Sequence, residues 1–273
     1  MTKQPNSRRN LDMAIHRMAA SDKDFVKLRA LLANAIVGQM LPNGAVKGGT
    51  ALKFRFGDAA TRFTTDLDAA RQSDLDAFVE KLEASLSSGW NGFAGRLVPR
   101  SQARPAHVPP QYVMRPFDIK IDYRGKPWCT VSLEVGHNEL GDADEPERML
   151  PPDIARMFRE LGFPDPDPLP LMPLHHQIAQ KLHGASEPGS KRAHDLIDLQ
   201  IIMRGATVDS TLTRRTCERL FAYRAMQPWP SVITKNEGWE TLYDAQVLPP
   251  PVLQSVDEAV AWANELVTTI ANA

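Results

Sequence analysis

The 273-residue sequence has no long apolar run, and no stretch approaches the ~20 apolar residues that a membrane-spanning helix requires. It has only two cysteines, Cys129 and Cys217, which lie far apart, so we expect no disulfide framework and a reducing compartment. The formal net charge is −1, so overall charge indicates neither a nucleic-acid nor a membrane partner. The first ten residues lack the apolar segment of a secretory signal. These absences predict a soluble, cytoplasmic protein.

The first half of the sequence mixes helical and strand patterns. Apolar residues recur at helical spacing from Leu11 to Met40, which predicts a helical N-terminal arm. Ser73 to Asp76 reads as a helix start with acidic residues in the first turn, opening a helix that ends near Ser87. The Arg- and Pro-rich stretch from Gly95 to Pro110 has little periodicity and is predicted to be a loop or an irregular edge.

Phe117 to Val135 is predicted to form a β-hairpin that turns around residues 124–127. Alternate residues of both arms are apolar, which indicates one buried face and one polar face. The polar face would carry Asp118, Lys120 and Asp122 on the first arm, and Thr130, Ser132 and Glu134 on the second.

The composition changes after His137. A Pro- and acid-rich connector over residues 141–173 brackets a short predicted helix at 154–161. From residue 174 onward the pattern is helical, with Pro-rich breaks at 226–230 and 249–251. We therefore expect a mixed α/β part followed by a helical part.

Two aspartates in Thr65-Asp66-Leu67-Asp68 are the first candidate site. On a strand, positions i and i+2 point to the same face, so Asp66 and Asp68 could hold one divalent metal, Mg²⁺ or Mn²⁺. Without a cation two such carboxylates would repel each other, and one pKa would rise. The upstream pair Gly48-Gly49 lets backbone amides approach a phosphate. Together these residues predict a metal and triphosphate site, as in nucleotidyl transfer.

A third metal-binding carboxylate is expected from the polar face of the hairpin. Both Glu134 and Asp122 lie on that face, and the sequence leaves the two alternatives open. We favour Glu134, because its arm is the more continuously apolar and is therefore expected to be the inner strand.

The second constellation lies in the helical part. Lys181 sits on an apolar helix, where its ammonium is expected to emerge at an edge, and Arg192, Asp195 and Asp198 follow on the next helix. One reading is an exposed Arg192–Asp195 ion pair, worth ~0.5 kcal/mol or less. The other is that Lys181 meets nucleotide phosphates while Asp195 or Asp198 fixes Lys181 or Arg192.

These motifs, in this order across residues 43–203, resemble the AbiEii-type nucleotidyltransferase family, the toxins of type IV toxin–antitoxin and abortive-infection systems, which are related to the MenT toxins. The resemblance implies an α+β fold with a polymerase-β-like nucleotidyltransferase core over residues 1–140 and a helical domain over 141–273. It also implies roles for particular residues. Phosphate or nucleotide binding falls to Gly48, Gly49, Thr50, Arg62, Lys181 and Arg192; metal binding to Asp66, Asp68 and Glu134; and catalysis to Asp66, Asp68, Lys181 and Asp198. The family's Lys-apolar-acid strand motif matches Lys120-Ile121-Asp122 in letters, but Ser132-Leu133-Glu134 matches its expected place.

The resemblance further implies transfer of a nucleotide from an NTP to an acceptor, with tRNA as the expected acceptor, and a cognate antitoxin protein as partner. Two alternatives stay open: a protein or small-molecule acceptor, and a catalytically idle binding module. Two basic groups could contact RNA phosphates or could equally be solvated. They comprise Arg96, Arg100, Arg104 and His107, and His175, His176, His183, Lys191, Arg192 and His194.

Overall fold

The protein is described by a computed structural model over residues 3–101, 113–246 and 252–273. The chain forms two compact units. The sheet unit comprises Met1–Gly57 and Thr64–Met172, and the helical unit comprises Asp58–Phe63 and Pro173–Ala273. The boundary falls at Met172 and not near residue 140, where the sequence placed it, because the connector contributes two strands and a helix to the sheet unit.

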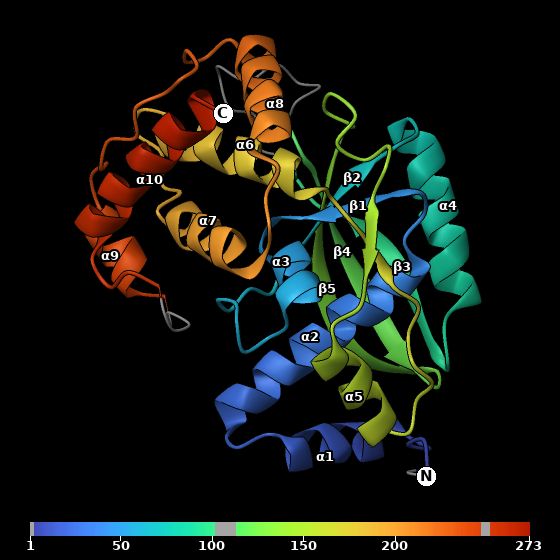
Figure 1. The fold of residues 1–273 in the computed structure, drawn as a ribbon. Coiled ribbons are helices and arrows are strands. Elements are labelled where there is room, and N and C mark those ends of the chain that lie inside the picture. Colours follow the sequence, from blue (N-terminus) through green and yellow to red (C-terminus); the bar gives the residue numbers. More distant parts are fainter. Residues whose placement is uncertain (1–2, 102–112, 247–251) are drawn as a thin grey trace. The chain divides into compact units, whose positions relative to one another are not determined.

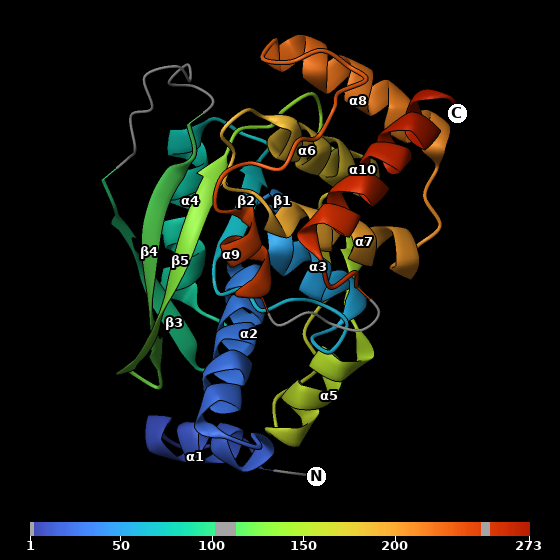
Figure 2. The ribbon, with the colours of Figure 1, turned by 90° about the vertical axis from the view of Figure 1, so that its left-hand side faces the viewer.

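The sheet unit is built on a mixed sheet in the order β3-β4-β5-β2-β1-β7-β6. Its strands are β1 (Gly44–Lys47), β2 (Leu67–Arg71), β3 (Phe93–Pro99), β4 (Arg115–Tyr123), β5 (Lys126–Gly136), β6 (Glu147–Met149) and β7 (Leu169–Leu171). β2 pairs with β1 antiparallel and with β5 parallel, so it lies at the centre of the sheet. Figure 2 shows β3, β4 and β5 side by side.

The predicted hairpin is confirmed as β4 and β5, joined through Arg124 and Gly125, which both have positive φ. The predicted faces are also confirmed, because burial alternates along both strands. The stretch from Gly95, predicted to be a loop or an irregular edge, begins within β3, which is an edge strand of the sheet and exposes Arg96 and Pro99. The rest of that predicted loop, residues 102–110, lies outside the described residues.

Helices cover the apolar face of the sheet, where one continuous core forms. They are α1 (Arg8–Met18), α2 (Asp22–Met40), α4 (Leu75–Ser88) and α5 (Pro152–Glu160) (Figure 1). The single helix predicted from Leu11 to Met40 is two, because the Ser21 side chain caps a new N-terminus by accepting from the Asp24 amide. The helix predicted from Ser73 is α4, capped by Asp74, and the one predicted at 154–161 is α5.

The helical unit consists, within the described residues, of α6 (Leu174–Ser186), α7 (His194–Gly205), α8 (Ser210–Arg224), α9 (Trp239–Asp244) and α10 (Val256–Ala271). The Pro-rich break predicted at 226–230 is confirmed, since no helix spans it. The second predicted break, at 249–251, lies outside the described residues. In the described parts of the chain, no helix has the length and hydropathy needed to cross a membrane.

Candidate active site

The centre of the sheet aligns a row of charged side chains. In the register of β1, β2 and β5, Lys47 lies opposite Asp68, and Asp68 lies opposite Glu134. Residues opposite each other in neighbouring strands project to the same face. Asp68 and Glu134 therefore share the face opposite the helix-covered core, to which Leu67 and Leu133 contribute.

The sequence placed Asp66 within a strand, but in the structure it lies directly before β2. Two hydrogen bonds hold its backbone: Thr50 Oγ1 donates to the Asp66 carbonyl at 2.6 Å, and Asn34 Nδ2 donates to the Thr65 carbonyl at 3.2 Å. The Asp66 side chain is exposed. The Thr50 hydroxyl thus fixes the segment that carries Asp66, and a contact of Thr50 with a phosphate stays a prediction.

Gly48 and Gly49 begin α3 (Gly48–Phe56), directly after β1. Gly48 has φ +68°, and a Cβ at this position would overlap Asp68 Oδ2. Glycine therefore allows the chain to turn into the helix against the carboxylate. The first amides of a helix have no intrahelical partner and favour anions, and no side chain caps α3. The start of α3 beside Asp68 is thus suited to a phosphate group.

Lys47 belongs to the same row, although the sequence motifs assigned it no role. Its side chain crosses toward β5, because a Cβ at Gly136 would lie 2.8 Å from Lys47 Nζ. The ammonium therefore lies on the face that carries Asp68 and Glu134. Its register opposite Asp68 depends on the pairing of β1 with β2, which a single sequence does not reveal.

Strand order separates the two candidates for the third carboxylate. β5 is an inner strand between β4 and β2, and Glu134 lies directly opposite Asp68. Asp122 is at the far end of β4, six residues from Pro116, which is the residue opposite Glu134. At about 3.3 Å per residue this is about 20 Å along the strand. Asp122 therefore cannot share a metal with Asp68.

The chemistry of this row fits a hard divalent cation. Mg²⁺ is usually held by one or two carboxylates together with substrate phosphates and water. In the described residues no three His, Cys, Asp or Glu side chains are grouped closely enough to hold a metal ion by themselves. Asp66, Asp68 and Glu134 therefore do not form a closed set of ligands, and metal binding by them stays a prediction in which a nucleotide supplies further ligands.

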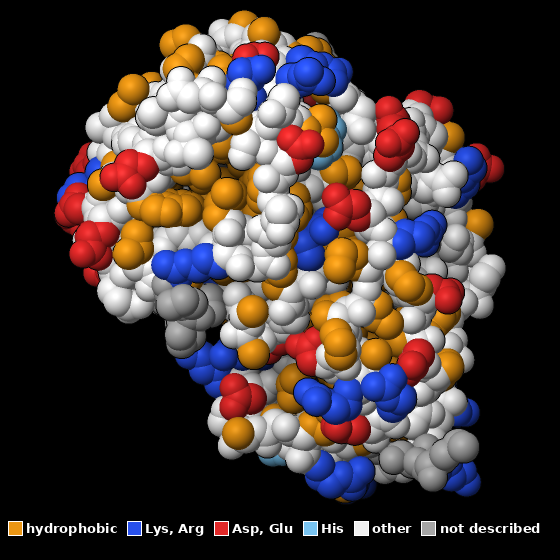
Figure 3. All heavy atoms as spheres, in the orientation of Figure 1, with side chains coloured by type: hydrophobic (Ala, Val, Ile, Leu, Met, Phe, Trp, Pro, Cys, Tyr) orange, Lys and Arg blue, Asp and Glu red, His pale blue; other side chains and the backbone are white. Residues whose placement is uncertain are grey.

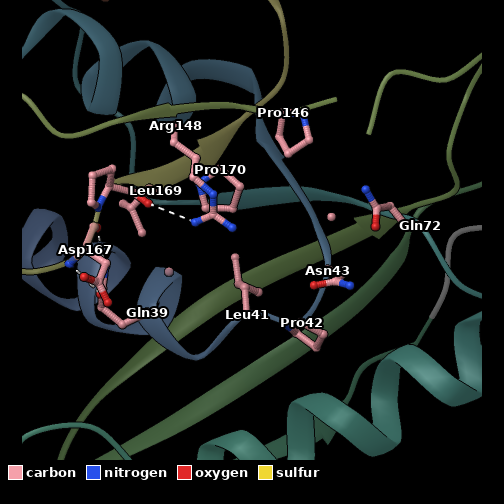
Figure 4. A pocket seen from close by; sticks show the side chains of 13 residues that line it. Gln39, Leu41, Pro42, Asn43, Gln72, Pro146, Arg148, Asp167, Leu169 and Pro170 are labelled. Carbon is pink, nitrogen blue, oxygen red and sulfur yellow. Dashed lines mark hydrogen bonds between the residues drawn. The ribbon is translucent and has the colours of Figure 1, made fainter. Parts of the chain in front are cut away.

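A separate cavity of about 410 Å³ lies in the sheet unit beside β7 and the start of β1 (Figure 4). Gln39 lines the cavity and bonds the backbone of Asp167 twice. Its Oε1 accepts from the Asp167 amide at 2.9 Å, and its Nε2 donates to the Asp167 carbonyl at 3.0 Å. Arg148 donates to the Pro168 carbonyl at 3.3 Å. Asp66, Asp68 and Glu134 do not line this cavity. The bonds of Gln39 and Arg148 hold the loop that contains Asp167 and Pro168.

In the helical unit the second constellation forms a buried ionic network. Lys181 Nζ lies 3.0 Å from Asp195 Oδ1 and 2.6 Å from Asp198 Oδ2. Arg62 donates two hydrogen bonds to Asp198, at 2.8 and 3.0 Å. Arg192 Nε lies 2.6 Å from Asp195 Oδ2. Both carboxylates are at most 1% exposed, so their charges depend on these cations.

The network holds both aspartates ionised. Burial alone would raise the pKa of Asp195, but Arg192 and Lys181 outweigh it and hold that pKa below its ordinary value. Burial opposes the same change at Asp198, where Lys181 and Arg62 lower the pKa. The pKa of Arg62 is raised overall, because the nearby Asp198 carboxylate outweighs burial, which would lower it.

The sequence interpretation of these residues is partly corrected. Lys181 does not emerge at a helix edge; it is 4% exposed, because α7 places two carboxylates against it. The prediction that Asp195 or Asp198 fixes Lys181 or Arg192 is confirmed, and both do so. Arg62 contacts Asp198, a partner that the sequence did not indicate. Contacts of Lys181, Arg62 and Arg192 with a nucleotide stay predictions.

The predicted basic groups are only partly exposed. Arg100 lies over the hairpin, donating to Ser132 Oγ at 2.9 Å, while Arg104 and His107 lie outside the described residues. His176 and His183 are buried in the helical unit, so they cannot form a surface patch. On the face shown in Figure 3, Lys and Arg side chains are interspersed with Asp and Glu.

An α+β fold with opposed carboxylates on two central strands, next to a Gly-Gly helix start, is the arrangement expected of a nucleotidyltransferase. The family model described as "Nucleotidyl transferase AbiEii toxin, Type IV TA system" matches residues 28–263. The chain therefore belongs to the AbiEii family of nucleotidyltransferases of type IV toxin–antitoxin systems.

A solved structure of similar fold supports this assignment. MenT4, a nucleotidyltransferase toxin from Mycobacterium tuberculosis H37Rv, is 18% identical, with a TM-score of 0.60 over 98% of this chain and 91% of that chain. A crystal structure of an H. pylori protein described as a nucleotidyltransferase is 13% identical, with a TM-score of 0.48 over 92% of this chain and 96% of that chain. No curated protein is a significant match. The expected α+β nucleotidyltransferase fold is thus confirmed.

Replacement of Gly48 tests the close approach to Asp68. Gly48→Ala is expected to lower stability by about 1 kcal/mol through the left-handed backbone and, in addition, to weaken binding of a Mg²⁺-bound NTP by displacing Asp68. Gly125→Ala is the matched control, because Gly125 has φ +71° and nothing lies within 4 Å of its added Cβ. Thermal unfolding and calorimetric nucleotide titration measure both effects. Equal nucleotide binding by the two variants would show that the approach is unimportant.

The buried network predicts an acid-sensitive stability. Because the folded-state pKa values of Asp195 and Asp198 are lowered, their contribution is complete above about pH 4, the ordinary aspartate range, and is lost as the pH falls below it. Between pH 6 and pH 3 the wild type should lose about 1 kcal/mol more unfolding free energy than Asp195→Asn, because the variant lacks one of the two carboxylates. Urea titrations measure this loss, with the exposed Asp76→Asn as control. A wild-type loss equal to that of Asp195→Asn would contradict the account.

Proposed function

We propose that the protein is a Mg²⁺- or Mn²⁺-dependent nucleotidyltransferase toxin that transfers NMP from an NTP to tRNA and thereby blocks translation. The observation that carries the proposal is the row in which Asp68 lies opposite Glu134, with the Gly48-Gly49 helix start against Asp68. Membership of the AbiEii family supports the toxin role and implies an antitoxin protein as partner.

In this proposal the sheet unit supplies the groups for phosphoryl transfer. The amides of Gly48 and Gly49 would bind phosphate oxygens, because they open a helix without a side-chain cap. Asp66, Asp68 and Glu134 would hold the cation, which supplies charge neutralisation of the triphosphate when it is bound. Lys47 would add a positive charge on the same face and so favour the negatively charged nucleotide.

The helical unit has a positioning role in this proposal. Lys181 and Asp198 are nearly fully buried, so we assign them to fixing neighbouring groups. Asp198 holds Arg62 through two hydrogen bonds, and Arg62 precedes Asp66 by four residues in the chain. Asp195 holds Arg192, whose side chain is 49% exposed and remains our candidate for a nucleotide contact in this unit.

The direct test is incubation of the purified protein with Mg²⁺, total tRNA and each of the four α-labelled NTPs. Label is expected in tRNA with the wild type, and a loss of at least about 100-fold is expected for Asp66→Ala and Glu134→Ala. Asp122→Ala is the matched control and should keep activity close to wild type, because it lies about 20 Å along β4 from the position opposite Glu134.

Each other outcome has a definite meaning. Label that appears in a protein band or a small molecule, and not in tRNA, would overturn the acceptor and leave the transferase chemistry. Activity lost in Asp122→Ala but kept in Glu134→Ala would contradict the third ligand. A wild type that labels nothing with Mg²⁺ or Mn²⁺ would contradict the catalytic proposal and favour a binding module.

A further inference from the structure

A cleft of about 310 Å³ opens in the sheet unit beside Asp66. Val26, Arg29 and Asn34 of α2 form one wall, and Thr130 and Ser132 of β5 form part of the other. The volume is at the lower end of the range of small-ligand pockets, about 300–1,000 Å³. The cleft therefore has room for one small ligand group next to a carboxylate of the candidate active site.

The cleft exists because β2 begins late relative to β5. Their register begins with Leu67 opposite Leu133, so the first part of β5, from Lys126 to Ser132, precedes the pairing. Thr65 and Asp66 pass along this part of β5 under α2. The result is a notch at the start of β2, with Asp66 on its border.

The lining combines apolar walls with hydrogen-bonding groups. Ala30, Ala33 and Val131 are apolar, while Thr65, Thr130 and Ser132 bring hydroxyls that can both donate and accept. Arg29 is held over the Trp128 ring at 5.6 Å, with its Nε 3.7 Å from Asp12 Oδ1. A flat apolar group that carries hydroxyls, such as a nucleoside with its ribose, matches this set.

The side of β2 on which the cleft lies distinguishes donor from acceptor. Gly48 and Gly49 follow β1, on one side of β2, whereas the cleft adjoins β5, on the other. If the donor triphosphate binds at Gly48 and Gly49, the second substrate must approach the aspartates from another direction. The cleft provides that direction and ends at Asp66.

We propose that this cleft holds the terminal nucleoside of the RNA acceptor, with its reacting hydroxyl turned toward Asp66. This inference rests on the proposed function. The hydroxyl oxygen forms a bond to the α-phosphorus as the bond to the departing pyrophosphate breaks. The hydroxyl proton passes to the Asp66 carboxylate and from there to water.

Filling the cleft tests the proposal. Ala30 is half-buried in its wall, so Ala30→Leu should occupy the space of the nucleoside and keep the helix intact. We expect the KM for total tRNA to rise at least about tenfold while the KM for the NTP stays within about twofold. Ala84→Leu, at an exposed position of α4, is the matched control and should change neither value.

A second measurement does not depend on a variant. Adenosine, the terminal nucleoside of tRNA, should inhibit labelling competitively against tRNA and not against the NTP. Ala30→Leu should weaken this inhibition at least about tenfold, in parallel with the tRNA KM. If Ala30→Leu does not fold, as judged by thermal unfolding, the adenosine experiment with the wild type decides.

Three results would overturn the inference. Competition of adenosine with the NTP, or a raised NTP KM in Ala30→Leu, would assign the cleft to the donor nucleoside. Kinetics of Ala30→Leu equal to those of Ala84→Leu would show that the cleft is not used. If the wild type labels no tRNA, the proposed tRNA acceptor is wrong before any variant is compared. The inference about the cleft is then wrong as well.

Discussion

The parallel pairing of β2 with β5 is the constraint on which the account of this protein depends. It brings Asp68 and Glu134 to directly opposite positions on one face of the sheet, although 66 residues of sequence separate them. Like charges in opposite positions destabilise a sheet. A protein that keeps such a pair must gain from it elsewhere, and binding of a cation with a negatively charged nucleotide is a sufficient gain. The turn at Gly48 and the lysine at position 47 complete the same arrangement from β1.

The candidate site carboxylates of the two units differ in burial and in pairing. In the helical unit Asp195 and Asp198 are buried and surrounded by Lys181, Arg62 and Arg192, so each negative charge has a fixed partner. Such a network sets positions and resists change, because removal of one partner leaves a buried charge. In the sheet unit Asp66 is exposed and Asp68 and Glu134 are half-buried, which leaves them accessible to solution. The first arrangement is suited to holding a structure and the second to binding.

Much of the sheet unit could be predicted from the sequence because its signals are local. The alternation along residues 117–135 predicted both faces of the hairpin. The Gly48-Gly49 and Asp66-Leu67-Asp68 motifs marked two segments that the structure brings together at the starts of α3 and β2. The features that the sequence did not give depend on distant pairings. The sequence favoured Glu134 over Asp122 through the expected inner strand, which the strand order confirms, but the exclusion of Asp122 required the pairing of β5 with β2. The burial of Lys181 required the position of α7. The strand signals of β3, β6 and β7 were weak because each of these strands contains Pro or Arg, so the sequence predicted a loop or an irregular edge for β3 and no strand for the other two.

The most direct test of the central claim is a titration with Mn²⁺ followed by electron paramagnetic resonance, with and without a non-hydrolysable NTP analogue. Mn²⁺ reports binding itself, so the test does not depend on the acceptor. The account predicts tight binding that requires the nucleotide and that is lost in Asp68→Asn and Glu134→Gln but kept in Asp122→Asn. Nucleotide-dependent binding that survives both Asp68→Asn and Glu134→Gln would show that this row of the sheet is not the metal site.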